Sequence, residues 1–317
     1  MLRDDLCGAS TFKERTLTAA WAALLLGRLL TADGGSAEGI RVIVHWLRDT
    51  TAFGATDTLT ADALGRFADL IRPTAGDSIR IVVSESGGSA YYGCDVVVGR
   101  DRAVDELRIL LVPRRWTIRR GDFAGETIAI DPRAALQRSP DRASFARVRS
   151  RRTVGWAEAS YPIPIVFRRA SAARIGAGDT AAFWSAARAV EQAIGASLFR
   201  PWGDTAMVGR IFPVDVGVDR IASAAVTYIS WDQDGNIFEG SVTFQSSRAL
   251  RDRSIVEHEL MHLLGFGHTT AWPSAVEAQP PPGRTVTADD AAYSQLLLRA
   301  HALEADPLLV AGLADAR

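Results

Sequence analysis

The chain has 317 residues, of which 47% are hydrophobic and 23% charged, and its formal net charge is −1. This length exceeds the needs of one small catalytic domain, so a second domain or a processed segment is expected. The near-neutral charge gives no indication of a nucleic-acid partner, and the two cysteines, Cys7 and Cys94, indicate no disulfide framework.

Residues 1–32 predict an export signal. Lys13 and Arg15 precede an apolar run at 17–26 that is too short to span a bilayer, and cleavage after Ala32 suits a small-residue site. The alternative is a cytosolic helix behind a misplaced start, because acidic residues precede the run and Arg28 interrupts its end. No later segment reaches membrane-spanning length. We therefore expect a secreted or extracytoplasmic protein of bacterial type.

Residues 33–132 predict a β-rich N-terminal domain, either a small sandwich or a barrel, and a helix is expected within it at 61–71. Its strand-like segments, separated by Gly, Asp and Pro turns, are 40–47, 78–84, 91–99, 106–116 and 126–131. This domain is either a prodomain, a binding module or a structural neighbour of the rest of the chain.

Residues 133–154 predict an exposed linker rich in arginine. Serine, proline and aspartate surround a cluster of its arginines, namely Arg138, Arg142, Arg147, Arg149, Arg151 and Arg152. The dibasic pair before Thr153 suits proteolytic removal of a propeptide. A solvated arm is the preferred interpretation, and a zymogen is the alternative.

Residues 155–317 predict a second, α+β domain. Its expected elements are a strand at 161–168, a long helix at 179–196, strands at 221–230 and 238–245, and a helix at 287–298. The turn between the last two strands carries Asp232, Asp234 and Asn236. Asp-Gly-Asn between apolar runs is typical of a hairpin turn, which we prefer. A short calcium-binding loop is the alternative, although the twelve-residue EF-hand spacing is missing.

The run from His258 to His268 reads His-Glu-x-x-His-x-x-Gly-x-x-His. On a helix, His258 and His262 present two imidazoles to one point, with Glu259 beside them. Gly265 can adopt a left-handed conformation, end the helix and bring His268 back to the metal. Ordinary histidines on an amphipathic helix are the alternative. The chain has five histidines, and three of them at ligand spacing favour one catalytic zinc ion.

This motif resembles that of the metzincin clan of zinc endopeptidases, and Thr269 after the third histidine is most similar to the serine of matrixin-like bacterial members. The resemblance covers residues 155–317. It implies a mixed twisted sheet, a long first helix, an active-site helix and a C-terminal helix. The chain departs from the clan at Pro273-Ser-Ala-Val276, which resembles the methionine-containing turn with Val276 in the methionine's place.

The resemblance also implies roles for individual residues. Glu259 is expected to be the general base that takes a proton from water and delivers it to the leaving amine. An extended protein or peptide substrate is expected to pair with an edge strand. The candidate strand is 221–230, although a buried strand is the alternative, and its candidate contacts are Ala224, Ala225, Val226 and Thr227. Matrixin propeptides place a cysteine on the zinc, so Cys94 is either a latency thiol or, as its apolar neighbours favour, a buried free thiol.

The sequence therefore predicts a secreted, monomeric zinc endopeptidase with no membrane span in the mature chain. One alternative is a zinc-binding relative of impaired activity whose N-terminal β domain binds protein or carbohydrate, and Val276 is its main support. Another is a zinc amidase that acts on a non-protein amide.

Overall fold

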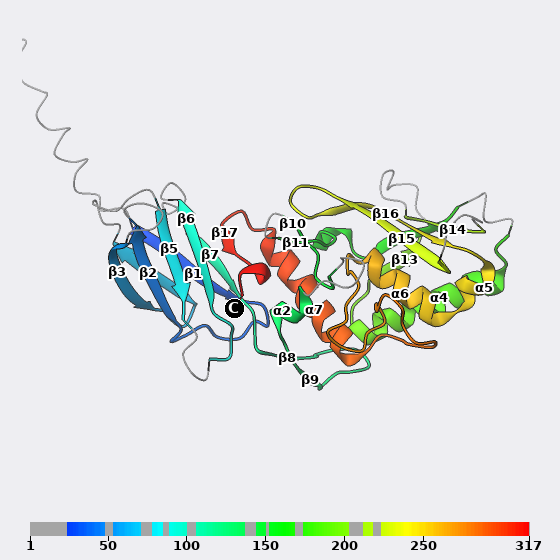
Figure 1. Ribbon diagram of the computed structural model, residues 1–317, viewed down its shortest axis with the longest axis horizontal. Coiled ribbons are helices and arrows are strands. Elements are labelled where there is room, and N and C mark those ends of the chain that lie inside the picture. The colour runs from blue at the N-terminus through cyan, green and yellow to red at the C-terminus, as the bar shows by residue number, and fades with distance from the viewer. Residues whose placement is uncertain are drawn as a thin grey trace, which may run out of the picture.

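The computed structural model describes residues 24–47, 53–70, 78–84, 89–99, 106–136, 144–149, 152–168, 174–202, 212–217 and 223–316. These residues form an α+β molecule in which a β sandwich adjoins a larger main body of sheet and helices (Figure 1). The two parts have separate hydrophobic cores. Among the described residues, no helix is both long and apolar enough to cross a membrane.

The sandwich consists of two four-stranded sheets that share one core. Their orders are β17-β7-β1-β4 and β3-β2-β5-β6. Strands in the first are β17 (Leu309–Ala311), β7 (Leu107–Leu111), β1 (Leu24–Thr31) and β4 (Arg66–Leu70). Strands in the second are β3 (Phe53–Thr60), β2 (Arg41–Leu47), β5 (Ser78–Val83) and β6 (Cys94–Gly99). Buried and more exposed residues alternate along β5 and β6, as in sheets with one face on a core. The β-rich character expected of the N-terminal region is therefore confirmed.

The helix expected at 61–71 is wrong. The Asp62 carboxylate accepts hydrogen bonds from the backbone N–H groups of Leu64 and Arg66, and Gly65 has a φ of 74°. This side-chain turn leads directly into β4, which pairs with β1 in antiparallel register. Local capping of a turn by aspartate therefore prevails over the helical pattern.

The predicted export signal overlaps a strand of the sandwich. Residues 1–23, including Cys7, lie outside the described residues, but 24–31 form β1 between β4 and β7. Leu25 and Leu29 are buried, whereas Leu26 points to solvent. Cleavage after Ala32 would remove this strand, so the structure argues against that boundary. An apolar run with alternating burial serves here as a sheet strand.

The main body is built on a five-stranded mixed sheet of order β13-β12-β14-β16-β15. The first four strands are mutually parallel, whereas β15 lies at the edge and is antiparallel to β16. In chain order the strands are β12 (Ile163–Phe167), β13 (Phe199–Pro201), β14 (Phe212–Val216), β15 (Ala225–Trp231) and β16 (Ile237–Phe244). Each strand and helix expected in this domain has a counterpart, although Ile221 and Ala222 of the expected edge strand lie outside the described residues.

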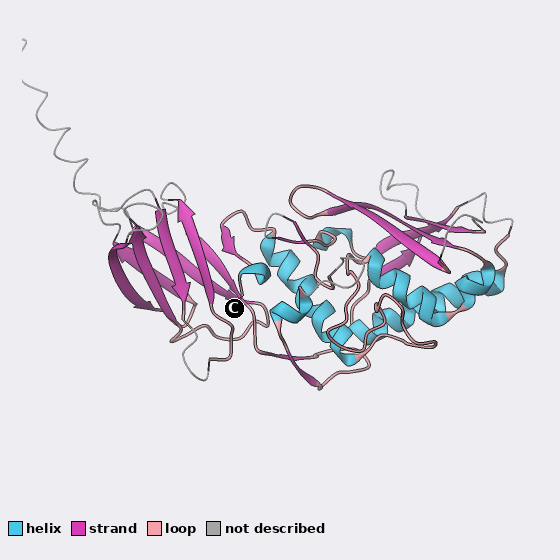
Figure 2. Ribbon diagram, viewed as in Figure 1, coloured by secondary structure: helices cyan, strands magenta, loops and turns pink. Residues whose placement is uncertain are grey.

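Helices of the described chain accompany this sheet (Figure 2). They are α4 (Ala177–Ile194), α5 (Ser247–Arg251), α6 (Arg253–Leu263) and α7 (Ala288–Glu304). Asp252 caps α6 by accepting from the N–H of Ser254, and Thr287 and Asp290 form a reciprocal capping box at the start of α7. Short elements complete the body: β8 (Arg115–Thr117), β9 (Thr127–Ala129), α2 (Pro132–Ala135), β10 (Val148–Arg149), β11 (Arg152–Thr153), η2 (Glu158–Ser160) and η3 (Leu313–Asp315).

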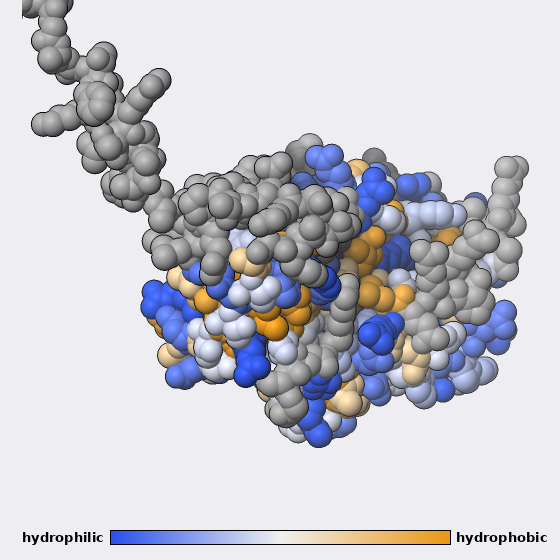
Figure 3. Space-filling view, turned by 60° about the vertical axis from the view of Figure 1, so that its left-hand side comes forward, coloured by the Kyte–Doolittle hydropathy of each residue, from blue (hydrophilic) through white to orange (hydrophobic). Residues whose placement is uncertain are grey.

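The chain crosses between the two parts at both ends of the main body. Strand β17, near the C-terminus, pairs in parallel with β7 of the sandwich, and Arg108 forms an ion pair with Asp306 beside it. Conversely, β8 and β9 pack on α7, where the Trp116 indole donates to Gln295 at 2.9 Å. The expected domain limits at 132 and 155 therefore do not coincide with the division of the chain between the two hydrophobic cores. Figure 3 shows hydrophobic residues in several small patches on one face of the molecule.

The segment 133–154 is only partly exposed in its described parts, so the exposed linker is wrong for its buried residues. Phe145 is fully buried, and its ring stacks on Phe266 with the centroids 5.0 Å apart. Trp272 and Tyr293 present their rings to Phe145 at steep angles. One aromatic side chain thus anchors an otherwise polar, arginine-rich segment to the main core, which charge composition alone could not reveal.

Candidate metal centre

Helix α6 carries the first two histidines of the motif and ends just after them. Gly265 follows with a φ of 104°, a conformation that suits glycine. A Cβ at this position would lie 3.0 Å from the Val154 carbonyl oxygen, so space as well as backbone conformation requires glycine. The chain then turns and brings His268 back to the helix, as expected from the spacing.

The Nε2 atoms of the three histidines converge on one point. The distances are 3.0 Å between His258 and His262, 2.9 Å between His262 and His268, and 3.3 Å between His258 and His268. Carbonyl oxygens fix two of the rings from the other side: His258 Nδ1 lies 2.7 Å from the Ala275 oxygen, and His262 Nδ1 lies 2.7 Å from the Phe266 oxygen. A carbonyl oxygen only accepts, so Nδ1 must carry the proton in both contacts. In a neutral ring, Nε2 then has a lone pair that is available to a metal ion.

This arrangement fits a metal ion and fits little else. Two neutral Nε2 lone pairs 3.0 Å apart cannot hydrogen-bond to one another, whereas a shared cation satisfies both. Zinc–nitrogen bonds of about 2.0–2.1 Å in a tetrahedron would separate the ligand atoms by about 3.3 Å, close to the observed spacing. Burial also lowers the pKa of His262 well below its usual value, and the neighbouring His258 and His268 lower it further. The His262 ring therefore remains neutral, as a metal ligand must.

Glu259 lies in the same cavity and is only 5% exposed. Burial raises the pKa of its carboxyl to about 7, while a hydrogen bond from Thr227 opposes that rise. A group with this pKa can accept and return a proton near neutral pH.

Thr227 connects Glu259 to the edge strand β15. Its hydroxyl lies 2.6 Å from Glu259 Oε2 and 3.1 Å from the Glu259 carbonyl oxygen. Ala224, Ala225 and Val226 line the cavity beside it. The residues expected to contact a substrate thus lie at the metal centre. Sequence reasoning missed the bond to Glu259, because no local pattern signals a contact across 32 positions.

The turn at residues 273–276 supports the first histidine. Its Ala275 carbonyl is the acceptor for His258, and Val276, the expected counterpart of the clan's methionine, is fully buried in the main core. The Asp290 carboxylate holds this turn in place through bonds from the Ser274 hydroxyl, the Ala275 N–H and the Trp272 indole. Sequence reasoning missed Asp290, although the capping pair that it forms with Thr287 was available as a signal.

The metal-site cavity has a volume of about 570 Å³. One wall is formed by the start of β15 and the residues before it, another by α6, and a third by a run of three prolines, Pro280–Pro282. Arg147, from the predicted linker, also lines the cavity. The sequence did not predict this position, because the arginine-rich composition of the segment is typical of exposed residues.

The turn with Asp232, Asp234 and Asn236 is a hairpin turn without a cation cluster. Asp232 Oδ1 accepts from the N–H groups of Asp234 and Asn236 at 2.9 Å each, and Asp234 pairs with Arg152 at 3.2 Å. Within the described ranges, the three histidines are the single group of three or more His, Cys, Asp or Glu side chains with ligand atoms close enough for one ion. The hairpin interpretation therefore stands, and the calcium alternative receives no support.

Cys94 does not reach the metal centre. It is a buried cysteine on β6 and belongs to the sandwich core, whereas α6, which carries two of the histidines, lies in the main body (Figure 1). Its backbone forms a bridge with Ala316 of the C-terminal segment. The apolar alternation of β6 places the thiol inward, so it cannot serve as a latency ligand in this structure.

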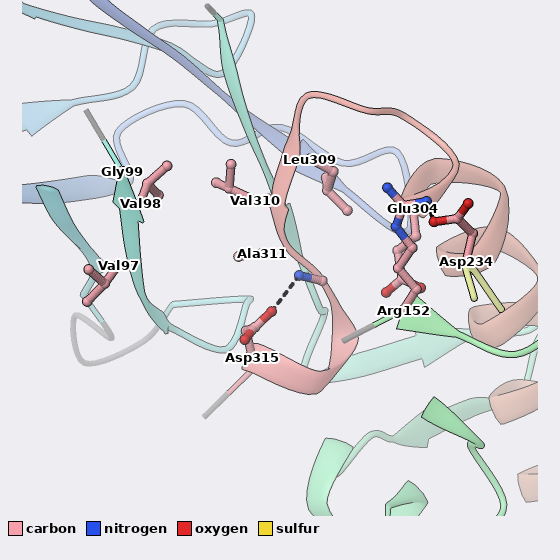
Figure 4. A pocket seen from close by; sticks show the side chains of 11 residues that line it. Val97, Val98, Gly99, Arg152, Asp234, Glu304, Leu309, Val310, Ala311 and Asp315 are labelled. Carbon is pink, nitrogen blue, oxygen red and sulfur yellow. Dashed lines mark hydrogen bonds and ion pairs between the residues drawn. The ribbon is translucent and has the colours of Figure 1, made fainter. Parts of the chain in front are cut away.

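A second cavity, of about 340 Å³, lies at the junction of the sandwich and the main body (Figure 4). Val97 and Val98 form its sandwich wall, and Arg152, Asp234 and Glu304 face them from the main body. Glu304 accepts from the N–H and hydroxyl groups of Thr153, which ties its carboxylate to the fold. This cavity contains none of the motif residues.

Comparisons with known proteins add no function. No protein-family model and no curated protein matches this chain. Two solved structures show a slight likeness, each with a TM-score of 0.22. A DUF3823 family protein from Parabacteroides merdae is 14% identical over 29% of this chain and 47% of its own, and (S)-allantoin synthase is 16% identical over 37% and 48%. The chain thus covers just under half of either protein, and a likeness this slight indicates neither fold nor activity.

Proposed function

We propose that this protein is a zinc-dependent endopeptidase of the metzincin type. His258, His262 and His268 are its metal ligands, and Glu259 is its general base. The observation that carries the proposal is the convergence of three Nε2 atoms, within 3.3 Å of one another, in the cavity that also holds the Glu259 carboxylate.

The surrounding fold supports this proposal. The mixed sheet, the long first helix α4, the helix α6 with two of the ligands and the C-terminal helix α7 are the elements that the sequence resemblance implies. Val276 replaces the turn methionine. It is an apolar, fully buried side chain, and the backbone of its turn still holds His258 through Ala275. The replacement is therefore compatible with metal binding.

The chain's own residues supply positioning and proton transfer. Zinc, when bound, supplies a water of lowered pKa and polarises a substrate carbonyl. Glu259 accepts a proton from the attacking water and returns it to the leaving amine nitrogen, which completes peptide hydrolysis. The Thr227 hydroxyl holds the carboxylate in place.

The edge strand supports an extended substrate. Among the described strands, β15 pairs with β16 alone, so no described strand takes the place beside its other edge where a peptide backbone would pair. Val226 and Thr227 are half-buried on this strand and line the cavity with the histidines. A peptide laid along β15 would therefore pass over the metal centre, as peptide-bond hydrolysis requires.

The test measures zinc content and cleavage of a quenched peptide library by the full chain. We expect one zinc per chain and peptide cleavage. Glu259→Ala should retain zinc and lower the rate by roughly 10²- to 10⁴-fold. Glu239→Ala, an exposed glutamate on β16, is the matched control and should leave both unchanged.

Three other outcomes would contradict the proposal in different ways. Zinc without cleavage would favour a binding protein of impaired activity. Hydrolysis of non-protein amides alone would favour an amidase. Absence of bound zinc from protein prepared with excess zinc would refute the proposal.

A further inference from the structure

A row of three arginines crosses the sandwich sheet that adjoins the main body. Strand β1 pairs with β4 on one side and with β7 on the other, and this register places Arg28 beside both Arg66 and Arg108. Side chains of residues paired in this way point to the same face of a sheet. Leu30, two residues after Arg28, is on that face too and packs against the main core. The row therefore points toward the main body, where α7 lies beside β7.

The two outer arginines of the row have acidic partners, whereas the central one has none among the described residues. Arg66 pairs with Asp62 at 3.1 Å. On the other side, Arg108 pairs with Asp306. Arg28 forms no ion pair with a described carboxylate, and its Nε–H is buried without a hydrogen-bond partner. A buried cationic donor without an acceptor is unfavourable, so an anion that accepts from it would be bound favourably.

A cavity of about 270 Å³ lies beside Arg28, between the sandwich and α7. Its walls are the last residues of β1, the turns at 35–37 and 63–65, and α7, which contributes Arg299. No aspartate, glutamate or histidine of the described chain lines this cavity. Two arginines from separate parts of the fold thus share a space that has no acidic side chain. Because like charges repel, this arrangement favours a ligand with negative charge.

The donors of this cavity suit a phosphate group. A guanidinium offers paired N–H donors that match two oxygens of one phosphate. A phosphate monoester has a charge of about −1.5 to −2 at pH 7 and three acceptor oxygens, so it can bind two arginines at once. Ser36 also lines the cavity, and because its oxygen accepts from the Glu38 N–H, its hydroxyl proton can be donated to the anion. Leu64 and Leu303 line the remaining space, which suits an apolar group attached to the phosphate.

We propose that Arg28 and Arg299 bind a phosphate group at the junction of the sandwich and the main body. The site shares no lining residue with the metal-site cavity, so the proposal does not rest on the proposed peptidase. Bound phosphate would connect β1 with α7. It should therefore stabilise the folded chain, as any ligand that binds the folded state alone does.

Isothermal titration calorimetry of the zinc-loaded full chain tests the proposal. The probes are inorganic phosphate, phenyl phosphate and benzoate. We expect both phosphates to bind, and benzoate, which has the ring and a single charge, to bind about tenfold more weakly than phenyl phosphate. Tighter binding of phenyl phosphate than of inorganic phosphate would assign the site to a phosphorylated small molecule, and equal binding would assign it to free phosphate.

Variants assign phosphate binding to the two arginines. Arg28→Gln and Arg299→Gln should each weaken it about tenfold or more, and Arg28→Lys, which keeps the charge without the paired donors, should recover only part of it. Arg188→Gln, which changes an exposed arginine on α4, is the matched control and should bind phosphate as the unaltered chain does.

Thermal unfolding gives a second measurement that also reports whether each variant folds. Saturating phosphate should raise the Tm of the unaltered chain and of Arg188→Gln, but not that of Arg28→Gln or Arg299→Gln. Without phosphate, Arg28→Gln should melt no lower than the unaltered chain, because it removes a cation that has no acidic partner. The proposal is overturned if no phosphate binds, if benzoate binds as tightly as phenyl phosphate, or if both folded glutamine variants bind phosphate normally.

Discussion

The sandwich and the main body bury different kinds of side chain. All the buried polar and charged side chains of the described residues fall between Thr153 and Glu304, in the main body, whereas the sandwich core is built from hydrophobic residues. A buried polar group without a partner costs about 1–3 kcal/mol. Such groups therefore persist where they hold something in place. Ser274 and Asp290 hold the turn that positions His258, and Glu304 is bonded to Thr153 beside the junction.

Two segments of the chain join the sandwich to the main body. Strand β17, from the C-terminal segment, completes one of its sheets, and Phe145 of the intervening segment lies in the main core. Proteolysis before Thr153 would leave the N-terminal portion attached through these contacts. A removable inhibitory prodomain is therefore difficult to reconcile with this fold, and Cys94 offers it no latency ligand.

Loss of Asp290 should have the largest effect of the substitutions considered. Its carboxylate accepts from four donors that belong to Trp272, Ser274, Ala275 and Thr287. Asp290→Ala leaves these donors buried, so we expect unfolding to become easier by about 3–5 kcal/mol. Because Ala275 orients His258, zinc affinity should fall roughly 10- to 100-fold. Urea unfolding and competitive zinc titration measure the two effects.

The adjacent Asp289 gives a matched control in the same helical turn. It is half-buried rather than fully buried, and Asp289→Ala leaves the bonds of Asp290 in place. Equal losses in the two variants would show that the Asp290 network does not support the metal centre.

Glu259 should make the metal-free main body sensitive to pH. Its pKa of about 7 in the fold exceeds the ordinary value of 4.5, so the folded state binds the proton more tightly. The stability gained from that proton is complete below pH 4.5 and is lost as pH rises through about 7. Glu259→Gln, which stays neutral, should become the more stable protein by about 3 kcal/mol at pH 8.

Urea unfolding of both chelator-treated proteins at pH 5, 6, 7 and 8 measures this difference. We expect the two stabilities to diverge as pH rises. Parallel curves would mean that the carboxylate is hydrated in the fold and that its pKa is ordinary.

The site was predictable to the extent that it is local in sequence. His258, Glu259, His262 and Gly265 follow from the period of one helix and the turn after it. The supporting residues do not, because Thr227, Phe145 and Asp290 act across long intervals that no spacing rule connects. Arg147 shows the difference best. The arginine-rich composition of its segment predicts an exposed side chain, but Phe145, two residues earlier, is buried in the main core, and Arg147 lines the metal-site cavity.

The fold was predictable where hydrophobic and polar residues alternate clearly. Prediction failed where a short segment fits more than one kind of structure. Strands such as β5 follow from period-two burial. Strand β1 was missed because its leucines also suit an export signal. The domain boundaries were missed because β17 has three residues, too few for any pattern, and because its partner β7 lies about 200 positions earlier.

A matched pair of core substitutions would sharpen the comparison of the two parts. Val44 on β2 and Val256 on α6 are both fully buried, one in each core. Valine to alanine should cost each part about 2 kcal/mol, because the same two methyl groups are lost. Val44→Ala should leave zinc affinity and kcat unchanged, whereas Val256→Ala, two residues before His258, should weaken zinc binding. Equal effects on zinc affinity would show that the sandwich core also governs the site.

Thr227→Val should have the smallest energetic effect and the most local one. The substitution keeps the shape of the side chain and removes one hydrogen bond to Glu259, 2.6 Å long in the fold. We expect kcat to fall about tenfold, or roughly 1.4 kcal/mol, while KM and zinc content stay nearly constant. Thr227→Ser restores the hydroxyl and should recover most of the rate. A hydrogen bond that positions the base acts on the chemical step and leaves peptide pairing along β15 unchanged, so it should alter kcat. A rise in KM at constant kcat would instead make Thr227 a substrate contact.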